Sequence, residues 1–305
     1  MKTLYPEIEP YITHNMAVDN QHILMVEESG NPNGIPVIYL HGGPGSNCKP
    51  HHRCFFDPNR YRIILFDQRG AGRSKPTASL ENNTTQHLLA DMETIRQQLK
   101  IETWLIFGGS WGATLGLLYA QQYPENVLGL ILRGVFLARQ RDFDWFYKDG
   151  GVNRIFPQQW NAFMQLVPKN QDPIKYYYKA LTNNDKAATL AWETWSSCIV
   201  SYGQFPAPTE VSHGTKIEVH YLINDFFIEE NQILNNLHKI KDKPAIIIHG
   251  QRDLVCPLEN AYSLAQNWPN SQLKIISTGG HLAADPEMIA ALVEATDYLL
   301  DKHSH

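Results

Sequence analysis

The sequence predicts an α/β fold: a mostly parallel sheet of eight strands, flanked by helices and interrupted by an inserted helical cap. Two observations favour it. Short apolar runs alternate with segments of helical periodicity over 1–135 and again over 240–305. Between them, 136–239 loses the apolar runs and holds 18 of the chain's 33 Phe, Trp and Tyr residues. We therefore expect one α/β core from 1–135 and 240–305, with 136–239 as a cap over the carboxyl edge of the sheet.

The elements of this core follow from turn residues and periodicity. Residues 11–18 and 21–29 are strand-like and flank Asp19-Asn20, a good turn pair, so they predict a hairpin. Further apolar runs predict strands at 35–40, 60–66, 103–109, 126–134, 243–250 and 272–278. Apolar residues at helical spacing predict helices at 84–99, 111–123, 258–268 and 285–300.

Charge and hydropathy exclude several classes of protein. The formal net charge is −5 and no basic block occurs, so we expect no nucleic-acid partner. No apolar run is long enough to span a bilayer, and the first residues lack the apolar region of a secretory signal. We therefore expect a cytoplasmic protein without a membrane partner.

Cysteine spacing gives little support for a metal site. The four cysteines stand at 48, 54, 198 and 256 and form no C-x-x-C pair, so they are expected to be free thiols. "HHRC" at 51–54 is the one alternative. No carboxylate or second Cys/His pair is placed to complete that site.

One serine stands where this kind of fold places a nucleophile. Gly108-Gly109-Ser110-Trp111-Gly112 fits G-x-S-x-G between a predicted strand and a predicted helix, the pattern of a nucleophile elbow. Small neighbours allow the sharp turn that projects the hydroxyl above the sheet. The alternative is a glycine-rich turn whose serine only caps the helix. A serine here argues against dehalogenase or epoxide-hydrolase chemistry, which needs a carboxylate nucleophile.

Two backbone N–H groups are predicted to stabilise a developing oxyanion. The N–H of Trp111 is expected to be free at the start of the helix. The second donor is expected in "HGGPG", residues 41–45, which follows an earlier strand. Gly43 is favoured for that role over Gly42.

A base and its orienting carboxylate are predicted further along the chain. Asp253 and His281 each follow a predicted strand, which gives the chain order Ser, Asp, His that is typical of this fold. His281 would take the hydroxyl proton of Ser110 during attack. Asp253 would fix the imidazole tautomer and stabilise the charged ring. The alternatives are a capping aspartate and a packed loop histidine.

Seven stretches resemble the proline iminopeptidase (prolyl aminopeptidase) family of serine α/β hydrolases. The resemblance covers nearly the whole chain, densely in the core and more thinly in the cap. It implies the α/β-hydrolase fold and Ser110, Asp253 and His281 as the triad. It also implies release of an N-terminal residue, typically proline, from small peptides without a metal or organic cofactor. The stretches are "HGGPG", "HHRCFFDPNRYRIILFDQRGAGRS", "GGSWGATL", "LILRGVF", "DWFYKDGG", "GQRDLVCP" and "GGH".

The resemblance also implies residues that read the free amino end of the substrate. Glu218 matches an acidic cap residue that meets the ammonium. A second family glutamate has its place at Ser196 in "AWETWSS". Glu193 lies one helical turn earlier, on the same face, and is expected to replace it in part. This departure leaves strict proline selectivity open.

Aromatic side chains are expected to hold the substrate ring. Phe136 matches a family aromatic that packs on the ring, and Trp145 and Phe146 stand where an aromatic pair occurs. We take Phe146 as the contact. Arg133 is a further substrate-binding candidate. The alternatives are packing for the aromatic residues and a structural ion pair for Arg133. Cys256 is expected near the site without being catalytic.

The sequence thus predicts a serine aminopeptidase that releases an N-terminal residue, most often proline, through an acyl-enzyme. The expected partner is a small peptide with a free N-terminus. The main alternative is an esterase or amidase with the same triad and a broader acyl pocket. Another is a binding protein on a hydrolase fold, without turnover. The oligomeric state is not predicted.

Overall fold

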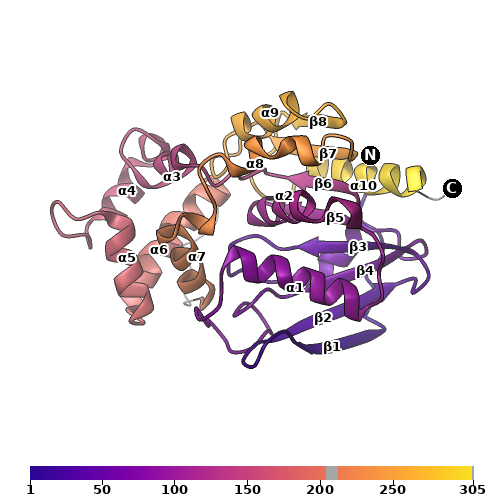
Figure 1. Ribbon diagram of the computed structural model, residues 1–305. Coiled ribbons are helices and arrows are strands. Elements are labelled where there is room, and N and C mark those ends of the chain that lie inside the picture. The colour runs from indigo at the N-terminus through magenta and orange to yellow at the C-terminus, as the bar shows by residue number, and fades with distance from the viewer. Residues whose placement is uncertain (204–211, 304–305) are drawn as a thin grey trace.

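The computed structural model describes residues 1–203 and 212–303, which contain a sheet of eight strands (Figure 1). The strand order is β1-β2-β4-β3-β5-β6-β7-β8. β2 pairs antiparallel with β1 and with β4, and every other neighbouring pair is parallel. The predicted mostly parallel sheet is therefore confirmed. The strands are β1 (Ile12–Ala17), β2 (Ile23–Gly30), β3 (Ile35–Leu40), β4 (Tyr61–Phe66), β5 (Trp104–Gly109), β6 (Val127–Arg133), β7 (Ala245–Gly250) and β8 (Ser271–Ile276).

Helices follow the strands and cover both faces of the sheet. The α-helices are α1 (Thr85–Gln98), α2 (Trp111–Gln122), α3 (Gln140–Tyr147), α4 (Pro157–Met164), α5 (Pro173–Thr182), α6 (Lys186–Ser201), α7 (Gly214–Ile223), α8 (Gln232–Asn235), α9 (Leu258–Gln266) and α10 (Pro286–His303). The 3-10 helices are η1 (Pro50–Phe55), η2 (Pro124–Asn126), η3 (Val152–Arg154), η4 (Asp225–Phe227) and η5 (Leu237–Lys239).

The central strands are apolar throughout because both of their faces are buried. In β3, Ile38 and Leu40 join the core beneath α1 and α2, together with Leu88 of α1. Val37 and Tyr39, which point to the other face, join the core beneath α10. A parallel strand covered on both sides has no polar face, so it reads as a continuous apolar run.

The N-terminal elements form as the sequence predicts. The hairpin pairs Ala17 with Ile23, with the Asp19-Asn20 turn between them. α1 begins after Thr84, whose hydroxyl accepts a hydrogen bond from a backbone N–H in the first turn of the helix. The predicted hairpin and helix are both confirmed.

The chain between β6 and β7 forms the helical insertion: α3 to α7 lie beyond one end of the sheet in Figure 1, while α8 lies beside α2. Its described part holds α3 to α8 and no strand. Side chains from α3 and α7 line a cavity with Ser110, so these helices cover the edge where the parallel strands end. We propose 136–239 as the limits of this cap; its residues 204–211 lie outside the described part of the chain.

Gly112 lets α2 lie directly against the end of β3. A Cβ at this position would lie 2.0 Å from the carbonyl oxygen of Leu40, a backbone atom that no side-chain rotation can move. We expect Gly112→Ala to lower the free energy of unfolding by about 1–3 kcal/mol through overpacking, measured by denaturant unfolding.

Gly280→Ala is the matched control for this prediction. A Cβ there would have no neighbour within 4 Å, so the expected change in the free energy of unfolding is below about 0.5 kcal/mol. Equal stability of the two variants would mean that β3 and α2 move apart at no cost.

Candidate active site

Ser110 joins β5 to α2 in a backbone conformation that few non-glycine residues adopt. Its φ is 57° and its ψ is −123°. Its N–H donates a hydrogen bond of 2.9 Å to the carbonyl oxygen of Arg133, which ties the turn to β6. Ser110 occupies the N-cap position of α2, but its side chain makes no capping hydrogen bond. The hydroxyl is therefore not engaged as a helix cap.

The guanidinium of Arg133 lies against this turn. A Cβ on Gly109 would come within 2.3 Å of Arg133 Nη2, so the guanidinium would have to move to admit one. Arg133 Nη1 donates a short hydrogen bond to the carbonyl oxygen of His281. No carboxylate of the described residues forms an ion pair with Arg133. Arg133 thus connects the turn at Ser110 with the loop that holds His281. The alternative role, a structural ion pair, does not occur among the described residues.

Asp253 and His281 form a hydrogen-bonded pair. His281 Nδ1 lies 2.8 Å from Asp253 Oδ2, while Asp253 Oδ1 accepts the N–H groups of Val255 and Cys256 at 2.9 and 2.8 Å. Burial favours the neutral acid, but the His281 imidazole and the backbone donor of Cys256 outweigh it and lower the pKa of Asp253.

This pair fixes the tautomer of the imidazole. An ionised Asp253 only accepts hydrogen bonds, so the proton of neutral His281 resides on Nδ1 and its Nε2 carries a free lone pair. Such an Nε2 can take a proton from a hydroxyl. His281 and Ser110 line the same cavity, and no hydrogen bond joins their side chains in the described residues. Catalytic hydrogen bonds in unliganded sites are often long and tighten on substrate binding.

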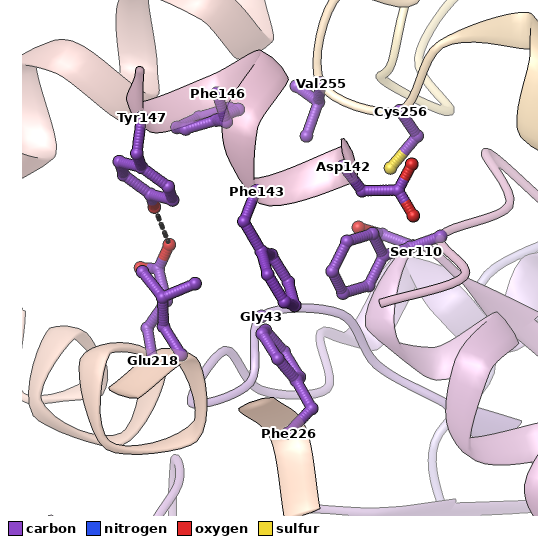
Figure 2. Close-up of a pocket in the computed structure, with 12 residues that line it drawn as sticks. Gly43, Ser110, Asp142, Phe143, Phe146, Tyr147, Glu218, Phe226, Val255 and Cys256 are labelled. Carbon is purple, nitrogen blue, oxygen red and sulfur yellow. Dashed lines mark hydrogen bonds between the residues drawn. The ribbon is translucent and has the colours of Figure 1, made fainter. Parts of the chain in front are cut away.

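Two cavities meet at Ser110. The inner cavity, of about 80 Å³, lies beneath the cap and runs from Ser110 and Gly43 to Glu218. Figure 2 shows Ser110 beside Asp142 and Cys256 at one end, with Tyr147 and Glu218 at the other. The outer cavity is larger, about 470 Å³, and contains Ser110, Arg133 and His281. The remaining aromatic walls of the inner cavity are Phe136, Phe143, Phe146 and Phe226.

Glu218, on α7, is the acidic end of the inner cavity. Tyr147 Oη donates to Glu218 Oε1 over 3.4 Å, and Trp192 Nε1 donates to Oε2 over 3.1 Å. Burial raises the pKa of Glu218 to about 7. The two hydrogen-bond donors lower this pKa by less than burial raises it, and the nearby Glu193 raises it slightly further. A cation brought into this cavity would stabilise the ionised form.

Glu193 and Ser196 do not line the inner cavity. Glu193 Oε1 accepts the N–H of Ser212 at 2.6 Å, which turns the carboxylate toward the chain at that end of α7. Glu193 Oε2 and Ser196 Oγ are buried without a hydrogen-bond partner among the described residues. The structure therefore brings Glu218 together with Ser110, but leaves Glu193 behind the cavity wall. A role for Glu193 at the ammonium stays a prediction.

The predicted oxyanion donors lie close to Ser110. Gly43 lines both cavities, and a Cβ on Gly42 would lie 3.5 Å from Ser110 Cβ. The backbone N–H of Trp111 makes no hydrogen bond within the described residues, while its indole Nε1 donates to Gln68 at 2.9 Å and points into the core. The roles of Gly43 and Trp111 remain predictions.

Of the predicted aromatic contacts, Phe136 and Phe146 line the inner cavity, whereas Trp145 does not. Trp145 instead donates its indole N–H to the carbonyl oxygen of Leu254 at 2.8 Å, across to the loop after β7. Cys256 lines the cavity near Ser110, as expected.

Six lining residues of the inner cavity were not predicted from the sequence. Five of them belong to the cap, and their place in the cavity depends on how the cap folds. Tyr147 and Val255 offered a signal, because they belong to the quoted stretches "DWFYKDGG" and "GQRDLVCP". Asp142 forms an ion pair with Arg139 at 3.2 Å. The six residues are Asp142, Phe143, Tyr147, Leu222, Phe226 and Val255.

The described residues offer no candidate metal centre. No group of three or more His, Cys, Asp or Glu side chains gathers among residues 1–203 and 212–303. In "HHRC", His52 Nδ1 accepts the N–H of Lys49 at 3.0 Å, and Cys54 is buried. All four cysteines are buried free thiols, as predicted. No helix in the same ranges has the length and apolarity needed to cross a membrane.

Comparisons with known proteins agree with this geometry. Residues 35–287 match the family model described as alpha/beta hydrolase fold. The chain is 46% identical to a proline iminopeptidase of Xylella fastidiosa, over 97% of this chain and 99% of that protein. It is 43% identical to a proline iminopeptidase of Arabidopsis thaliana, over 97% of this chain and 82% of that protein.

A solved structure supports the fold independently. An esterase from Exiguobacterium antarcticum superposes with a TM-score of 0.59 at 24% identity, over 91% of this chain and 96% of that one. The fold of the sheet, the serine elbow and the full-length similarity point the same way. The chain belongs to the alpha/beta hydrolase fold family and, within it, to the proline iminopeptidases.

Proposed function

We propose that this protein is a serine aminopeptidase that releases an N-terminal residue, most readily proline, from small peptides. The observation that carries the proposal is the inner cavity, which has a hydroxyl at one end, a carboxylate at the other and aromatic rings between them. Its relatives at 43–46% identity bear the name proline iminopeptidase.

The two ends of the cavity fit a free amino terminus. The Glu218 carboxylate meets the positive charge of the substrate's imino nitrogen, and the rings of Phe136 and Phe146 pack on the apolar pyrrolidine. Burying the ammonium beside Glu218 compensates both charges in a place that water does not reach freely. The scissile carbonyl then lies at Ser110, one residue from the amino end.

The chemistry we propose is acyl transfer in two steps. Ser110 Oγ attacks the carbonyl carbon while its proton passes to His281 Nε2. The N–H groups of Trp111 and Gly43 stabilise the oxyanion, and Asp253 stabilises the imidazolium. The C–N bond breaks as His281 gives the proton to the leaving amine. Water then attacks the ester, His281 takes its proton and returns it to Ser110 Oγ, and the free amino acid leaves.

A panel of arylamides tests this function. Proline, alanine and N-blocked proline arylamides are compared with short aryl esters by kcat/KM. We expect proline arylamide to be cleaved fastest among the amides and the N-blocked compound to be cleaved at least about a hundredfold more slowly, because it has no charge for Glu218. Rapid cleavage of the N-blocked compound would contradict an exopeptidase.

One observation favours the alternative function, a broader esterase or amidase. Ser196 stands where the family has a second glutamate, and in the structure it does not reach the inner cavity. Fewer contacts to the ammonium weaken the requirement for a free amine. In the same panel, esters cleaved faster than proline arylamide would favour this alternative.

The pH dependence offers a test that leaves the triad untouched. Because the pKa of Glu218 is about 7 in the free enzyme, kcat/KM should fall below pH 7 as the carboxyl takes up a proton and loses its attraction for the ammonium. Tyr147→Phe removes a donor that stabilises the ionised form. We expect this variant to move the acid limb to higher pH, measured as a pH profile of kcat/KM. An unmoved limb would mean that Glu218 does not control it.

A further inference from the structure

The outer cavity has a charge character that the proposed reaction does not use. It lies on the side of Ser110 away from Glu218, and its lining includes Arg133, His51 and His52. None of the described residues that line it is acidic. A cavity that holds a guanidinium and lacks acidic groups favours an anionic ligand.

Arg133 supplies a permanent charge at this place. A guanidinium keeps its proton throughout the physiological range and offers five N–H donors. One nitrogen, Nη1, donates to the carbonyl oxygen of His281, and no ion pair with a described carboxylate compensates the charge. A partly buried guanidinium without an acidic partner is costly unless a ligand supplies the anion.

His52 adds a neutral donor beside Arg133. Its Nδ1 accepts the N–H of Lys49 at 3.0 Å, so the proton of the neutral ring resides on Nε2. Burial, with His51, His41, Arg133 and Lys49 around it, lowers the pKa of His52 to about 3, which keeps the ring neutral. Stacking on Tyr39, at 4.4 Å between ring centroids, fixes its orientation. His52 Nε2 has no partner among the described residues and is left to donate.

The distances fit the carboxylate of a dipeptide. Three bonds of about 1.3–1.5 Å separate the scissile carbonyl carbon from the terminal carboxyl carbon, so the two lie within ~4 Å. The Arg133 guanidinium touches Gly109, the residue directly before Ser110. The wall beyond it is apolar, formed by Leu4, Phe55, Leu282 and Ile289.

We propose that the outer cavity binds the leaving residue through its free α-carboxylate, held by Arg133 and His52, so that the preferred substrates are proline dipeptides with an apolar second residue. This inference rests on the proposed function. Glu218 then binds the amino end of the dipeptide and Arg133 binds its carboxyl end, with Ser110 between them. Both ends of a dipeptide are charged, and each meets a group of opposite or complementary character.

The test compares Pro-Leu with its C-terminal amide. The two differ only in the charge that Arg133 and His52 would bind, so wild type should cleave the free acid about tenfold to a hundredfold more efficiently by kcat/KM. In Arg133→Met and in His52→Phe the acid-to-amide ratio should fall, in Arg133→Met to near one. The ratio cancels any loss that comes from a displaced His281, because both substrates suffer it equally. His238→Phe, at an exposed position, is the matched control and should keep the wild-type ratio.

The possible outcomes distinguish failure of the carboxylate site from failure of the proposed aminopeptidase function. An acid-to-amide ratio near one in wild type, or one unchanged in both variants, overturns the carboxylate site even if proline arylamide is cleaved well. Cleavage of the arylamide but not of Pro-Leu overturns it too. If neither proline arylamide nor any proline peptide is cleaved, the aminopeptidase function itself fails.

Discussion

Replacing Ser110 with alanine is expected to lower kcat for proline arylamide by about 10⁴-fold or more. The hydroxyl is the group that would bond to the acyl carbon, and no other lining residue of the described chain takes its place at the elbow. The backbone donors and the Glu218 site stay, so KM should change little. Steady-state kinetics gives both values, and labelling with a fluorophosphonate should be lost in the same variant.

Ser263→Ala is the control for this experiment. Ser263 lies on α9 and donates to Glu259, outside both cavities. It should keep wild-type kcat and fluorophosphonate labelling. Ser110→Ala should also unfold at the wild-type denaturant midpoint or above it, since Ser110 holds a conformation that alanine shares at no greater cost. Wild-type turnover by Ser110→Ala would end the acyl-enzyme mechanism, and a wild-type chain that resists labelling would favour a binding protein.

The sequence was sufficient to predict the core and the positions of the three proposed catalytic side chains. Each of Ser110, Asp253 and His281 follows an apolar strand within a few residues. The carboxyl ends of neighbouring parallel strands meet at one edge of a sheet, so local patterns alone bring these side chains near each other. The hydrogen bond between His281 and Asp253 is the outcome that such reasoning expects.

The cap was less predictable, because helical periodicity gives the buried face of a helix but not what covers it. Glu193 and Ser196 lie three positions apart on α6, and each has a buried oxygen without a hydrogen-bond partner among the described residues. Glu193 accepts from Ser212, and neither residue lines the inner cavity, which only the packing of α6 against α7 decides. For the same reason the sequence did not predict Phe226, a residue of η4 that lines the same cavity as Ser110.

Arg133 makes a contact that no local sequence pattern predicts. Its partner is the carbonyl oxygen of His281, 148 positions further along the chain. Every residue has a backbone carbonyl, so the residue type does not indicate this acceptor. The sequence therefore offered only an ion pair or a substrate contact as roles for Arg133. The three-dimensional fold alone brings the end of β6 beside the histidine loop.

Glu218→Gln is expected to lower kcat/KM for proline arylamide by about 10²–10⁴-fold, since removing one partner of a buried charge pair costs about 3–5 kcal/mol. Glutamine keeps the volume: its carbonyl oxygen can accept from Trp192 and its NH2 group can donate to Tyr147 Oη, so the cavity should keep its shape. The N-blocked substrate carries no ammonium, and its slow cleavage should change little. The acid limb near pH 7 should disappear from the profile if Glu218 is its cause. Glu294→Gln, which removes an exposed carboxylate from α10, controls for the change in net charge. A loss that is equal for free and N-blocked substrates would show that Glu218 supports the fold of the cap and does not read the amino terminus.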